Sequence, residues 1–180
     1  LALKKKYKLK IIGSKKDEKR IPGIDIKLSD KENFKLGNID FKIFLIPGHT
    51  NGHICFYSKN EKVIFTGDTL FSLGCGKIFE GTHLEMLKSL NLIKKLPIDT
   101  QIYCGHEYTK KNFKFCIKYE VNNKLLEREK WILSRLHQNL PTIPVTVKEE
   151  LSTNIFLRCY NLELKKSLDM KNSTELEVFK

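Results

Sequence analysis

The sequence of 180 residues predicts an α/β fold, in which a sheet with polar residues at its strand ends is followed by a helical domain. Two observations support this prediction. In the first part of the chain, short apolar runs end at a glycine followed by a polar residue, as buried strands do. From residue 109 onward, the chain is rich in helix formers, and its apolar residues recur at helical spacing. We therefore expect two domains, residues 1–108 and 109–180.

The first domain contains five predicted strands. The first alternates lysine with apolar or aromatic residues and is expected at a sheet edge, whereas the others are largely apolar and are expected in the core. The five strands are residues 8–12, 41–46, 53–57, 63–65 and 101–103.

Helices are predicted where capping signals precede apolar stripes. Thr82 and Glu85 have the spacing of a capping box, and the helix that they open carries its apolar residues on one face and ends before Pro97. The glycines before it predict a flexible loop at residues 74–76. Later helices are predicted by Phe113, Ile117, Leu125, Ile132 and Leu136, and by capping boxes at Thr146/Glu149 and Thr174/Glu177.

The length of 180 residues allows one sizeable core, or a core plus a smaller appended unit, and the composition predicts no membrane span. No apolar stretch approaches the roughly 20 residues that a spanning helix needs. The five cysteines form no CxxC pair, and their odd number argues against a disulfide framework, so a reducing compartment is expected. We expect a cytoplasmic, soluble monomer with no membrane partner.

The net charge of +12 raises the question of a nucleic-acid partner. The charge is +7 in residues 1–48, zero in residues 49–108 and +5 in residues 109–180. The neutral middle holds the candidate site residues, and elsewhere the lysines are dispersed. We therefore interpret the charge as solvated surface and expect no nucleic-acid partner.

One local pattern occurs three times: an apolar strand, a glycine, and then His49, Asp68 or His106. The glycine permits a tight turn, so that the next side chain projects beyond the sheet. Three such strand ends could bring two imidazoles and one carboxylate together, a ligand set that suits zinc and also iron or manganese. Nucleophilic catalysis by Cys104 beside His106 is a weaker alternative, because adjacent side chains at a strand end point to opposite faces.

Four motifs, PGHTNGH, FTGDTLF, GCGKIFEGT and YCGHEYT, occur in this order. With their spacing, they resemble the glyoxalase II family, the hydroxyacylglutathione hydrolases of the metallo-β-lactamase superfamily. The resemblance implies a metallo-β-lactamase-type αββα sandwich with a C-terminal helical domain that binds glutathione. It extends to about the segment STNIFLRC.

The resemblance also implies a binuclear metal centre with two divalent ions, zinc in the first place. His49 and His106 would each bind one metal, and Asp68 would bridge both, so these three residues are the predicted catalytic set. A metal-bound hydroxide would attack the thioester of S-lactoylglutathione to give glutathione and D-lactate. His53 matches a family histidine outside the metal ligands and is expected to support them.

For the glutathione part of the substrate, the resemblance implies contacts from Lys77, Phe79, His106 and Tyr108. A cationic Lys77 suits the two carboxylates of glutathione. Phe79 stands where relatives often carry tyrosine, so a hydroxyl donor is missing there.

The chain departs from the family pattern at its start. The family's HxHxDH cluster should precede His49, but residues 1–48 contain no histidine. The chain is therefore expected to lack its N-terminal part and, beyond the short helix opened at Thr174, a basic cluster that contacts glutathione. We expect little or no hydrolase activity from these 180 residues alone.

Three other functions remain as alternatives. A related persulfide dioxygenase would use one iron and consume oxygen. A nuclease of the same superfamily would bind RNA or DNA in a salt-dependent way. A non-catalytic remnant would keep the fold without the upstream histidines.

Overall fold

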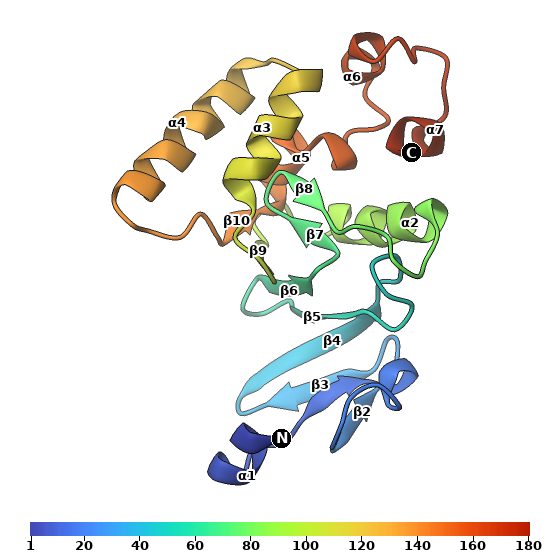
Figure 1. Cartoon of the computed structure of the whole chain (residues 1–180), viewed down its shortest axis with the longest axis vertical. Coiled ribbons are helices and arrows are strands. Elements are labelled where there is room, and N and C mark those ends of the chain that lie inside the picture. Colours follow the sequence, from blue (N-terminus) through green and yellow to red (C-terminus); the bar gives the residue numbers. More distant parts are fainter.

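The computed structural model describes all 180 residues, and a mixed six-stranded sheet lies at its centre (Figure 1). The strand order is β10-β9-β6-β5-β4-β3, and all neighbours are antiparallel except the parallel pair β6 and β9. The bounds are β3 (Asn33–Leu36), β4 (Ile39–Leu45), β5 (Ile54–Ser58), β6 (Val63–Gly67), β9 (Gln101–Cys104) and β10 (Val145–Thr146). The predicted strands at 41–46, 53–57, 63–65 and 101–103 are confirmed within one to two residues.

The pairing explains why three strand ends meet. Both β4 and β6 run antiparallel to β5, so they point in the same direction. Strand β9 is parallel to β6 and shares that direction. The carboxyl ends of β4, β6 and β9 therefore lie at one edge of the sheet, where each strand is followed by a candidate ligand.

The start of the chain differs from the prediction. The strand predicted at residues 8–12 is wrong: residues 2–7 form a helix, and Lys8 ends it in the left-handed conformation with φ of 53°. Its backbone N–H donates to the Lys4 carbonyl, which is incompatible with an extended strand. Of the predicted range, only Ile12 lies in a strand. The elements here are α1 (Ala2–Tyr7), β1 (Ile12–Ser14), the 3-10 helix η1 (Lys15–Asp17) and β2 (Ile26–Leu28), with β1 and β2 parallel.

Helix α2 (His83–Lys94) covers one face of the sheet. Its predicted capping box is present, with the Thr82 hydroxyl accepting from the Glu85 backbone N–H at 3.2 Å. Its apolar stripe is buried against residues of the central strands. This core includes Ile46, Ile64, Met86, Leu90, Ile93 and Ile102, all with no exposed surface.

The remaining helices gather at the opposite end of the molecule from α1 (Figure 1). They are α3 (Thr109–Tyr119), α4 (Asn123–His137), α5 (Val147–Thr153), the 3-10 helix η2 (Ile155–Leu157), α6 (Leu162–Ser167) and α7 (Glu175–Phe179). Buried residues of α3, α4, η2 and α6 form a second core, which also contains Leu73 from a β-hairpin. Buried residues of α5 and α7 belong instead to the core around α2. Strand β10, in turn, joins the main sheet, so the two regions are interlocked. The division at residue 108 stays a prediction.

The hairpin consists of β7 (Leu70–Phe71) and β8 (Gly74–Cys75). The flexible loop predicted at residues 74–76 is wrong, because Gly74 lies in β8 and Gly76 is buried against the Asp68 backbone. All five cysteines are free thiols, and every helix is too short or too polar to cross a lipid bilayer.

Candidate metal centre

His49 is held by the turn that follows β4. Gly48 has a φ of 145° and lies so close to Met86 that a Cβ would meet it at 2.8 Å, so only glycine fits there. The His49 Nδ1 lies 2.7 Å from the Lys77 carbonyl oxygen, which can only accept. Nδ1 therefore carries the proton, and the Nε2 lone pair is free to bind a metal.

Asp68 follows Gly67, whose φ is 51°. The backbone N–H of Asp68 donates to Nε2 of His53 at 3.0 Å, so this ring nitrogen must be unprotonated. Burial lowers the pKa of the His53 imidazole, and the nearby His49 acts in the same direction. A neutral His53 thus anchors the Asp68 backbone, in agreement with the supporting role expected for it.

His106 follows the turn after β9. A Cβ at Gly105 would lie 2.4 Å from an Asp68 carboxylate oxygen, so the glycine permits the close approach of the two segments. The His106 ring stacks on Tyr108 with a centroid distance of 4.8 Å, and its side chain is about half exposed.

The two imidazoles face different oxygens of one carboxylate. His49 Nε2 lies 3.5 Å from Asp68 Oδ2, and His106 Nε2 lies 3.5 Å from Asp68 Oδ1. The structure contains no group of three or more His, Cys, Asp or Glu side chains that could hold one metal ion. The three residues instead form two half-sites that share Asp68, each with one imidazole nitrogen and one carboxylate oxygen.

This donor chemistry fits divalent zinc, iron or manganese. Two protein donors in each half-site are fewer than the three or four that zinc takes from a protein in most sites. The chain therefore places one carboxylate between two imidazoles, with a different oxygen facing each ring.

The predicted substrate residues flank the two half-sites. Lys77 Nζ lies 5.3 Å from the centroid of the Phe79 ring, and the Phe79 ring lies 5.0 Å from that of His49. Tyr108 lies on the other side, against His106. Lys77, Phe79 and Tyr108 are all exposed, so they are accessible to a ligand.

Cys104 shows no sign of a nucleophile. Its thiol donates to the His106 carbonyl at 3.4 Å, and burial raises its pKa above the usual value. Because the thiolate is the reactive form, a raised pKa makes this thiol less reactive at neutral pH.

Sequence reasoning missed a contact that supports the loop after His49. The backbone N–H of Asn51 donates to Glu80 Oε2 at 2.8 Å, and Arg20 forms ion pairs with both Glu80 and Asp17. Arg20 and Glu80 are 60 residues apart. No local pattern could have predicted this link.

Two family models together match nearly the whole chain. Residues 2–106 match the metallo-beta-lactamase superfamily, and residues 107–180 match the hydroxyacylglutathione hydrolase C-terminus. Among curated proteins, the chain is 59% identical over 157 residues to the hydroxyacylglutathione hydrolase of Pelagibacter ubique, covering 87% of this chain and 66% of that protein. It is 44% identical over 180 residues to the enzyme of the same name from Chelativorans sp., covering 99% and 71%.

Solved structures share the fold. ETHE1 from Myxococcus xanthus matches with a TM-score of 0.63 and 18% identity, covering 99% of this chain and 58% of that one. The BLEG-1 B3 metallo-beta-lactamase matches with a TM-score of 0.61 and 21% identity, covering 87% and 68%. The predicted metallo-β-lactamase fold with a C-terminal helical region is thus confirmed.

Proposed function

Because the chain belongs to the hydroxyacylglutathione hydrolase family of the metallo-β-lactamase superfamily, we propose that it hydrolyses S-2-hydroxyacylglutathione thioesters. S-lactoylglutathione is the proposed substrate, with glutathione and D-lactate as products. The chain spans 66% of the length of the Pelagibacter relative, so this activity is proposed for the full-length protein. One observation carries the proposal: Asp68 presents separate oxygens to His49 and His106.

The superfamily binds divalent metal ions, and we propose two zinc ions here. His49 and one oxygen of Asp68 would hold the first, and His106 with the other oxygen would hold the second. When bound, the metals would supply a water that is acidic enough to act as a nucleophile at neutral pH and would polarise the thioester carbonyl.

The chain's own residues orient this centre. The Lys77 carbonyl fixes the His49 tautomer by accepting from Nδ1, and His53 fixes the Asp68 backbone. The exposed ammonium of Lys77 would attract the carboxylates of glutathione. Phe79 and Tyr108 would contact the substrate on either side. A thiolate leaves readily, so the site needs no strong general acid.

The 180 residues by themselves place two side chains in each half-site. Since metal affinity depends on the number of ligands, we expect weak metal binding and little turnover from this segment alone.

The test is Asp68→Ala in the full-length protein, with Asp40→Ala as the matched control. Asp40 is an exposed aspartate of β4 whose closest cation, Lys35 Nζ, lies 4.0 Å away. Loss of the bridge should lower turnover of S-lactoylglutathione by about 100-fold or more. Metal analysis should show fewer than two ions per chain. The proposal fails if Asp68→Ala retains two metals and normal turnover.

A further inference from the structure

The turn between β7 and β8 has a strained backbone. Leu73 has a φ of 59°, which is unfavourable for a residue with a branched side chain. Leu73 is also fully buried and packs with Phe113, Leu125 and Ile132 in the core of the helical region. Contacts with the helices must therefore hold this turn in place.

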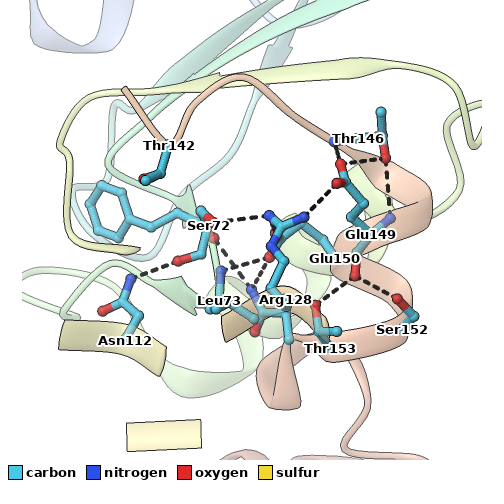
Figure 2. A network of polar contacts seen from close by, with 12 residues as sticks. Ser72, Leu73, Asn112, Arg128, Thr142, Thr146, Glu149, Glu150, Ser152 and Thr153 are labelled. Atoms are coloured by element: carbon cyan, nitrogen blue, oxygen red, sulfur yellow. Dashed lines mark hydrogen bonds and ion pairs between the residues drawn. The ribbon is translucent and has the colours of Figure 1, made fainter. Parts of the chain in front are cut away.

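The carboxylate of Glu150 supplies the central contact (Figure 2). Glu150 has no exposed surface, and it accepts the Leu73 backbone N–H at 2.8 Å. It also accepts from Asn154 Nδ2 at 2.9 Å and from Arg128 Nη2 at 3.2 Å. Arg128 is 5% exposed and balances the buried negative charge.

Side chains from three helical segments bind the rest of the turn. Arg128 donates to the Ser72 hydroxyl at 3.2 Å, and Asn112 of α3 donates to the Ser72 carbonyl at 2.9 Å. Asn154 donates to the carbonyls of residues 71 and 74, at 3.3 and 3.1 Å. The helical region thus determines the position of the turn at several points.

The segment that follows β8 lies against two of the three proposed ligands, Asp68 and His49. A Cβ at Gly76 would lie 1.8 Å from the Asp68 carbonyl oxygen and 3.3 Å from His49 Nδ1. The carbonyl oxygen of the next residue, Lys77, accepts a hydrogen bond from His49 Nδ1 at 2.7 Å. Only residues 74–76 therefore lie between Leu73, whose amide Glu150 holds, and Lys77, whose carbonyl orients His49.

We propose that Glu150, together with Arg128, is a positioning residue for the metal centre. By holding the Leu73 amide it places the Lys77 carbonyl, and that carbonyl sets the ring orientation and tautomer of His49. The helical region thereby contributes to the metal half-site as well as to the surface around it. The inference rests on the proposed function in taking His49 as a metal ligand.

The test compares Glu150→Gln with Glu127→Gln in the full-length protein. Glu127 is an exposed glutamate of α4, so the control makes the same chemical change at a solvated position. Nitrogen NMR of the histidine rings in the metal-free protein reports the His49 tautomer without any dependence on hydrolysis. Glu150→Gln should convert a single Nδ1–H form into a mixture, and zinc affinity should fall about 10-fold. Glu127→Gln should match the parent in both measurements.

Glu150→Gln leaves Arg128 without its buried counter-ion and could unfold the protein. Asn112→Ala is therefore the second variant, since Asn112 is only partly buried and donates one bond to the Ser72 carbonyl. It should shift the His49 signals in the same direction by a smaller amount. A folded variant at either position with parental His49 signals and zinc affinity overturns the proposal. The NMR result stands apart from the Asp68→Ala test, so failure of positioning and failure of the proposed function can be told apart.

Discussion

At the scale of residues, Asp68 links the two half-sites because each of its oxygens faces a different imidazole. The grouping of these three proposed ligands could be predicted, since each is the first polar residue after a strand and a glycine. The glycines are needed for space: at Gly105 a Cβ would lie 2.4 Å from the Asp68 carboxylate. The choice of His49 tautomer could not be predicted, because its acceptor is a backbone carbonyl 28 residues away.

Gly76 offers a direct test of this close packing. In Gly76→Ala, the new methyl group would meet the Asp68 backbone carbonyl at 1.8 Å, and a shift of either segment would displace a proposed ligand. We expect the free energy of unfolding to fall by about 2–3 kcal/mol, with a loss of zinc binding. Urea denaturation and zinc titration measure the two effects.

The control is Gly37→Ala, in a turn where a Cβ would meet nothing within 4 Å although φ is 59°. It should cost about 1 kcal/mol for the left-handed backbone and leave zinc binding unchanged. Equal losses of stability in the two variants would show that space at Gly76 is not limiting.

At the scale of elements, strong local patterns predicted the core strands and the capped helices. The strand predicted at residues 8–12 failed because alternation in a lysine-rich segment without burial does not determine conformation; no residue of α1 is buried. The burial of Arg128 could have been predicted from its position in the sequence. It lies three residues after Leu125 and four before Ile132, so it falls on the buried face of α4.

The capping box at the start of helix α2 can be tested by substitution of Thr82. Thr82→Ala removes the hydroxyl that accepts the Glu85 N–H, and we expect it to lower the free energy of unfolding by about 1 kcal/mol. Thr82→Ser retains the hydroxyl and should stay close to the parent in urea denaturation. An alanine variant as stable as the serine variant would show that the cap contributes nothing.

At the scale of the whole molecule, strand direction brings the site together and the helical region holds it in place. The shared direction of β4, β6 and β9 follows from pairings that no single segment specifies. The hydrogen bond between Leu73 and Glu150 joins residues 77 apart, so no single segment specifies it either. The sequence therefore predicted that His49, Asp68 and His106 come together. The residues that support them could be identified only from the tertiary structure.

Anomalous diffraction from crystals of the full-length protein with zinc tests the shared carboxylate most directly. We predict two zinc peaks, one bound by His49 and one oxygen of Asp68, the other bound by His106 and the second oxygen. Both histidines on a single zinc ion, or zinc ions that do not contact Asp68, would contradict the bridging arrangement.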